Sequence, residues 1–188
     1  MTYPIPVVQM MGNIVTAVQA AILTQLQGAN SDIVAINYLF GHPLELIATL
    51  QEKQKSPTSK MNIYPLVMLF TDIPEHWGNP GGYYADVTLQ MVIAYSSKPD
   101  LKAADRLTKN FLPILLPIYQ ELMKQIVASG YFVTQNQKGL KHIKLDRYYW
   151  GKTGLYGNTA NQFNDFLDAI EIKDLQLKLT NQKPPFQK

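Results

Sequence analysis

The 188-residue sequence contains no cysteine and few charged residues. Without cysteine the chain has no disulfide framework, no thiol nucleophile and no thiolate metal ligand, which suits a reducing compartment. Charged residues make up 16% of the chain and the formal net charge is +3, too little to indicate a nucleic-acid-binding protein. No uninterrupted apolar run reaches the roughly 18 residues that span a bilayer, and the first residues lack a basic signal-type start. We therefore expect a soluble protein that stays in the cell that makes it and binds no membrane.

Motifs for catalysis are also missing. His42, His76 and His142 lie in three separate segments, and none has a second ligand at metal-binding spacing on the same helix. The serines lack a Gly-x-Ser-x-Gly setting, so a hydrolase triad is unsupported. The glycine-rich residues 78–82 lack the Lys-Ser/Thr of a phosphate-binding loop. We expect no enzyme: no catalytic residue, cofactor, metal or small-molecule substrate.

A carboxylate group near the last strand needs separate treatment. Asn164, Asp165 and Asp168 could support acid–base chemistry if they lined a cleft and had shifted pKa values. Residues of these types more often cap helices or form turns, and we favour that interpretation.

The sequence is rich in apolar and aromatic residues. It is 46% hydrophobic, with 11 tyrosines and 7 phenylalanines. Sparse charge with many aromatics indicates either a well-filled core or a surface covered by another protein. The length fits one domain with a sizeable core.

Two β-rich runs, residues 64–70 and 87–95, are the clearest structural signal. In the second run alternate residues from Val87 to Tyr95 are apolar, which predicts a strand packed firmly on one face. The polar, aromatic segment between the runs is broken by glycine and proline, so we predict a long antiparallel hairpin with an extended tip. Long ordered loops on rigid hairpins usually bind something.

Helical spacing of apolar residues predicts three helices. The first starts at Val7 and ends at Gly28–Asn30, and a short one covers residues 44–53 after a strand at 33–39. The longest covers residues 101–129, with Pro113 and Pro117 inside it. Proline removes a backbone donor and clashes with the preceding turn, so we predict a kink or a break there.

Two further strands complete the predicted sheet. Residues 140–150 alternate imperfectly, as an edge strand does when its lysines face solvent. In the last strand, residues 167–179, the apolar positions change parity, and a bulge near Lys173–Asp174 would restore the phase. We predict an α+β fold with a mostly antiparallel sheet and a long hairpin. The N-terminal and long central helices would pack on one face. Residues 1–180 would form a single domain, with 181–188 as a flexible arm.

This order of elements resembles the neck and tail-completion proteins of tailed bacteriophages, the tail-terminator group and its head–tail connector relatives. The hairpin (YPLVMLFTDIPE into DVTLQMVIAYSS), the long helix (DRLTKNFLPILLPIYQELMKQI) and the final NDFLDAIEIKDLQLKL carry the resemblance, over roughly residues 5–180. It implies a non-enzymatic virion protein, assembled in the bacterial cytoplasm as a hexameric or dodecameric ring around the DNA channel. Neighbouring portal, connector and tail proteins would be its partners, and any lumenal DNA contact would be non-specific. The short helix at 44–53 and the prolines of the long helix depart from the pattern.

Aromatic residues in or beside loops are the candidate interface anchors, because Tyr and Trp are enriched at protein interfaces. They are Trp77, Tyr83, Tyr84, Tyr148, Tyr149, Trp150 and, in the arm, Phe186. Lysines and Arg147 near some of them leave an alternative open: a small nucleic-acid-binding module that uses residues 141–152 to stack bases.

Overall fold

The computed structural model describes residues 5–55, 63–77, 85–133, 139–148, 150 and 166–179. Helices pack with one mixed, mostly antiparallel sheet, which confirms the predicted α+β class. In chain order the elements are α1 (Val7–Ala29), β1 (Asn37–Gly41), α2 (Pro43–Lys55), β2 (Leu66–Phe70), β3 (Glu75–Trp77), β4 (Ala85–Ser96), α4 (Ala103–Arg106), the π-helix η1 (Leu107–Leu115), α5 (Leu116–Ala128), β5 (Ile143–Arg147) and β6 (Leu167–Lys178).

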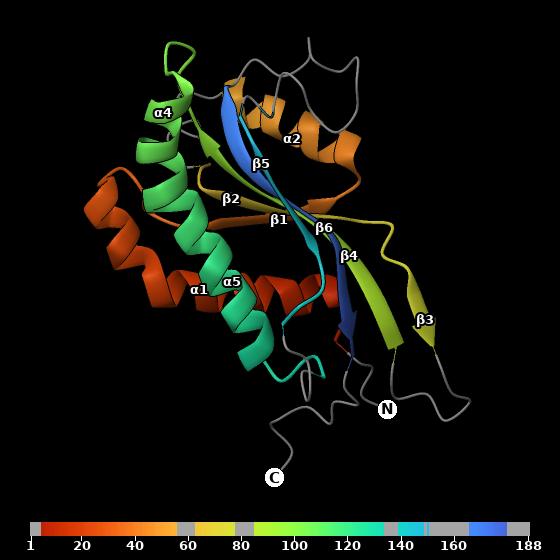
Figure 1. Ribbon diagram of the computed structural model, residues 1–188. Coiled ribbons are helices and arrows are strands. Elements are labelled where there is room, and N and C mark those ends of the chain that lie inside the picture. Colours follow the sequence, from red (N-terminus) through yellow and green to blue (C-terminus); the bar gives the residue numbers. More distant parts are fainter. Residues whose placement is uncertain are drawn as a thin grey trace.

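The strands form one mixed sheet in the order β1-β2-β4-β6-β5, with β3 pairing to β4 beside the end of β2 (Figure 1). β2 pairs antiparallel with β4, Leu66 opposite Ala94, which confirms the predicted hairpin. β4 with β6 and β5 with β6 are also antiparallel, and only β1 with β2 is parallel. The parallel pair needs a crossover connection, and α2 supplies it.

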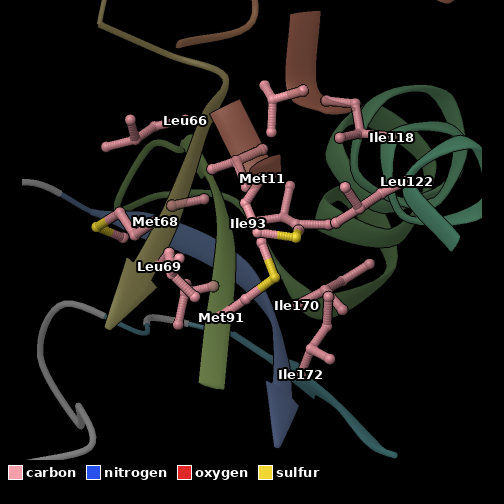
Figure 2. Packing of buried hydrophobic residues seen from close by; sticks show 14 of the residues in the cluster. Met11, Leu66, Met68, Leu69, Met91, Ile93, Ile118, Leu122, Ile170 and Ile172 are labelled. Carbon is pink, nitrogen blue, oxygen red and sulfur yellow. The ribbon is translucent and has the colours of Figure 1, made fainter. Parts of the chain in front are cut away.

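The face of the sheet that α1, η1 and α5 cover contains alternate residues of each central strand. Ile93 of β4 lies opposite Ile170 of β6, and both are fully buried. Ile118 and Leu122 extend from α5 toward Met11 of α1 and toward Ile93 (Figure 2). The predicted packing of the first and central helices on one face is therefore observed.

The opposite face is also largely buried. Leu66 and Met68 of β2 point away from α1 and α5 (Figure 2) and are at most 1% exposed. α2 lies on this side of the sheet (Figure 1), with Leu46 and Leu50 buried. Because both faces are covered, β2 consists of five consecutive buried residues instead of alternating ones.

The predicted bulge in the last strand is confirmed. Between Leu89 and Met91 of β4 the chain advances by two residues, while β6 advances by three, from Leu175 to Ile172. The extra residue lies at Lys173–Asp174, and Asp174 adopts a left-handed backbone conformation with φ 52°. The bulge keeps Leu175 and Leu177 on the same face as Ile170 and Ile172, so all four are buried.

The predicted break at the prolines is absent, and the helix changes its hydrogen-bonding pattern there instead. The chain runs as one helical stretch from α4 through η1 to α5 (Figure 1), and Pro113 lies inside the π-helix. The Leu116 N–H donates to the carbonyl of Phe111, five residues earlier, where an α-helix would use the fourth. The wider turn accommodates Pro113, which the interior of an α-helix would not. Pro117 lies in the first turn of α5, where proline is tolerated.

The sheet differs from the prediction in strand bounds, including β5, which covers Ile143–Arg147 instead of 140–150, and in one added strand. β1 begins at Asn37 instead of residue 33, because the Ile33 N–H bonds to Asn30 in a turn and the Ile36 N–H donates to the Gln19 side chain of α1. The segment predicted as a hairpin tip contains a further strand, β3, whose His76 lies opposite Asp86 of β4. Together β3 and the adjoining end of β4 project from the sheet on the side remote from α4 (Figure 1).

α1 is long and apolar enough to cross a membrane by length and composition alone. Eight of its residues, including Met11 and Leu26, are buried against the sheet and α5. A core helix passes the same test, and these contacts account for the apolar face of α1.

Candidate functional site

The described structure separates the seven predicted interface aromatics. Trp77 is the last residue of β3 and lies opposite the fully buried Ala85 of β4. Tyr83, Tyr84, Tyr149 and Phe186 lie outside the described residues.

Tyr148 and Trp150 are engaged within the chain itself. The Tyr148 ring is half-buried and packs on Phe111 of η1, with ring centroids 4.7 Å apart. Trp150 is only 7% exposed, and its indole N–H donates to Glu171 Oε1 at 2.8 Å. Trp150 therefore offers little surface to a partner and serves to cover the α2 side of the sheet near β6.

Glu171 holds the end of β5 against β6. Its side chain is 2% exposed and accepts from Trp150 and from Arg147 Nε, at 2.8 and 3.0 Å. Lys173 lies 3.7 Å away on the same carboxylate. A buried carboxylate needs such donors to offset its lost hydration, which explains why a charged residue is tolerated in the middle of β6.

The basic side chains of β5 are matched by carboxylates. Arg147 pairs with Glu171, and Lys144 pairs with Asp146 while lying 5.4 Å above the centre of the Tyr119 ring. Cations already held by neighbouring acids attract phosphate less, which weighs against the nucleic-acid alternative for residues 141–152.

Tyr119 of α5 and His142, just before β5, form a small polar contact. The Tyr119 hydroxyl lies 2.7 Å from His142 Nε2, and His142 Nδ1 lies 2.7 Å from the carbonyl of Leu140. Because a carbonyl only accepts, the neutral ring carries its proton on Nδ1 and accepts the Tyr119 hydroxyl proton at Nε2. Burial, and then Asp146, raise the pKa of Tyr119, so its hydroxyl is not an activated nucleophile.

A cavity of about 300 Å³ lies where the end of α1, the end of β4 and η1 meet. Most of its lining surface is apolar, but the polar side chains of Asn30, Tyr95, Ser97, Lys109 and Asn110 also line it. Asn30 Nδ2 donates to the Tyr95 hydroxyl at 2.7 Å. Nothing in the sequence pattern marked this cavity, because residues 29–30 and residues 95–114, far apart in the chain, line it together.

Beneath the cavity a buried ion pair joins α4 to β6. Arg106 and Asp168 are both fully buried, with Nη1 and Oδ1 2.7 Å apart. Asn110 donates to the other carboxylate oxygen at 2.7 Å, and Ser97 accepts from both Arg106 and Asn110. The Arg106 guanidinium also donates to two carbonyls, those of Leu101 and Lys98.

This cluster corrects the interpretation of Asp168 as a capping or turn residue. Asp168 is a strand residue of β6, opposite Tyr95, and its carboxylate is saturated by Arg106 and Asn110. Asn164 and Asp165 lie outside the described residues. Full pairing makes Asp168 a structural anchor, because a general base needs a free lone pair facing its substrate.

Among the residues that the structure describes, no three His, Cys, Asp or Glu side chains gather as metal ligands would. No protein-family model matches the sequence, and neither does any curated protein. The functional inference therefore rests on the geometry of the described residues.

Buried tyrosines give a testable dependence on alkaline pH. Burial raises the pKa of Tyr38 and of Tyr95 above their ordinary value of 10.0. Above that value the unfolded chain loses these protons while the folded chain keeps them, so the folded state binds more protons and the free energy of unfolding falls as pH rises.

We expect denaturant unfolding to show this decline between about pH 9 and about pH 11, since unfolded tyrosine titrates near 10. Tyr38→Phe should flatten the slope, although it also removes the hydrogen bond from Tyr38 to the Val8 carbonyl and so lowers stability at neutral pH. An unchanged slope in Tyr38→Phe would contradict the assignment to this phenol.

Proposed function

We propose that this chain is a structural, non-catalytic subunit of a tailed phage or prophage. It forms an oligomeric ring at the neck or tail end that joins head and connector to tail and surrounds the DNA. The element order that carries the resemblance supports this: helix, strand, helix, hairpin, long helix and two strands.

The observation that carries the proposal is the distribution of charge. Residues 1–44 contain a single carboxylate, Asp32, and no lysine or arginine. They include α1, whose outer face carries exposed Gln9, Asn13 and Thr16, and the edge strand β1. Solvated surfaces of monomers normally carry charge, and depletion of charge marks the central part of protein interfaces.

The projecting end of the hairpin offers a second contact. β3 and the end of β4 reach beyond the body of the sheet (Figure 1), and Trp77 lies on β3. In a ring, such an arm would reach the next subunit or an adjoining ring of portal, connector or tail protein. Together with the charge-poor residues 1–44, it would give the subunit two distinct contact surfaces, as a head-to-tail ring requires.

The test is the solution mass of the purified chain over a wide concentration range, by light scattering after size exclusion at moderate salt. We expect a discrete closed oligomer, a hexamer or a dodecamer. A mass that stays at the monomer at every concentration, with a shift only on adding single-stranded oligonucleotide, would overturn the proposal and favour the nucleic-acid module.

A further inference from the structure

The sheet has two ends that the described residues leave open. β1 and β5 terminate the strand order, and no other described strand pairs with the outer side of either. An open strand edge is a template for pairing with another strand.

The two edges run in directions that suit each other. β1 is parallel to β2, and each of the following steps, from β2 to β4, β6 and β5, reverses direction. β1 and β5 of one chain are therefore antiparallel. If a second copy extended the sheet by placing its β5 beside β1, the new pair would be antiparallel, the more stable of the two pairings.

The edges also match in length and in the faces of their side chains. Each strand has five residues, with Leu39 and Leu145 at the centres. Aligning the centres places Leu39 opposite Leu145 on the α2 side, and Phe40 opposite Lys144 on the side of α1 and α5. These sides follow from the pairing of Leu39 with Met68 and of Lys144 with Ile172. A slip of one residue would put every side chain on the wrong face.

β1 lacks the features that protect open edges. Natural edge strands carry charges, prolines or bulges, whereas β1 reads Asn-Tyr-Leu-Phe-Gly and its Phe40 is 51% exposed. On β5, Ile143 is 50% exposed. The charged neighbours Lys144 and Asp146 pair with each other along their own strand, so they bring no unmatched charge to a partner.

We propose that β5 of one copy adds to β1 of the next, so that the sheet continues head to tail from subunit to subunit. The inference names the contact that would build the ring and rests on the proposed function for its closure. β1 and β5 are different surfaces, so the contact is heterologous, as ring formation requires.

The absence of cysteine allows a direct test with Phe40→Cys and Lys144→Cys. Opposed residues of an antiparallel pair have Cα atoms about 4.5–5.5 Å apart, within the range of a disulfide. Each single variant is oxidised mildly alone and in an equal mixture, and the products are separated on a non-reducing gel. We expect a covalent dimer in the mixture alone, and a ladder of multimers from the double variant.

A mixture of Leu112→Cys and Lys144→Cys is the control, because Leu112 is 53% exposed on η1, away from β1. Cross-linking in the control at the same yield, or in Phe40→Cys alone, would overturn the proposal. If light scattering finds a closed oligomer but Phe40→Cys and Lys144→Cys do not cross-link, the proposed ring is retained and the β1–β5 contact is rejected. The cross-link with a mass that grows without limit would support the contact and reject the closed ring.

Discussion

Replacing Arg106 by methionine is expected to lower the free energy of unfolding by about 3–5 kcal/mol, the cost of leaving one partner of a buried ion pair alone. The guanidinium joins the start of the long helix to β6 through Asp168, and to the end of β4 through Ser97. Methionine fills similar space but donates no hydrogen bond, so the Asp168 carboxylate stays in the interior without its cation, with the Asn110 amide still donating to it.

The matched control for Arg106→Met is Lys109→Met on the same helical stretch. Lys109 pairs with Asp105 at 3.7 Å, but the two side chains are 60% and 47% exposed. An exposed pair of this kind contributes about 0–1 kcal/mol, so the control should unfold almost as the native chain does. Chemical denaturation monitored by circular dichroism makes the comparison.

Adding Asp168→Leu to Arg106→Met should recover part of the lost stability, because replacing both partners by apolar groups removes the uncompensated charge. If Arg106→Met and Lys109→Met lose equal stability, the ion pair is not the anchor described here. The ion-pair account would also be contradicted if the double variant lost more stability than Arg106→Met and Asp168→Leu lose in sum.

We expect the second large loss of stability when Leu122 is replaced by alanine. Leu122 is fully buried and extends from α5 toward Met11 and Ile93, where α1, α5 and the sheet meet (Figure 2). Removing its three carbons leaves a cavity in the core, and such changes cost about 2–5 kcal/mol.

Leu112→Ala is the control for the same chemical change on the same run of helix. Leu112 is 53% exposed, so its truncation creates no cavity and should change stability by about 0.5 kcal/mol or less. Thermal or denaturant unfolding separates the two variants. A similar loss at both positions would mean that α5 does not pack on α1 as described.

The sequence alone predicted correctly those structural features that depend on a local pattern of apolar residues. In β4 the alternation from Val87 to Tyr95 predicted which face is buried, and in the structure that face packs against the helices. The change of parity in β6 required an extra residue, and it lies at Lys173–Asp174. Both inferences depend only on the two-residue period of a strand.

Strand direction and long-range pairing were not predictable in this way. Nothing local distinguishes a parallel β1–β2 pair from an antiparallel one, because the direction is set by the crossover through α2. No sequence pattern marks Arg106 as a buried residue, because its carboxylate partner Asp168 lies 62 residues away in the chain. Trp150 likewise resembled a loop aromatic until Glu171 was seen to accept from its indole.

The candidate contact surface also combines features that the local sequence predicts with features that only the fold determines. Aromatic content and sparse charge indicated either a well-filled core or a surface covered by another protein, and the lack of charge over residues 1–44 can be seen in the sequence alone. Which edge those residues form depends on the strand order, which places β1 at one end of the sheet and β5 at the other. The cavity between α1, β4 and η1 gave no sequence signal, because its lining is assembled by the fold.

Electron microscopy of the purified chain, negatively stained at a concentration where light scattering finds an oligomer, tests the central claim most directly. The account predicts closed rings of uniform diameter with a central opening wide enough for duplex DNA. Compact particles without an opening would contradict the claim that this chain is a ring-forming structural subunit.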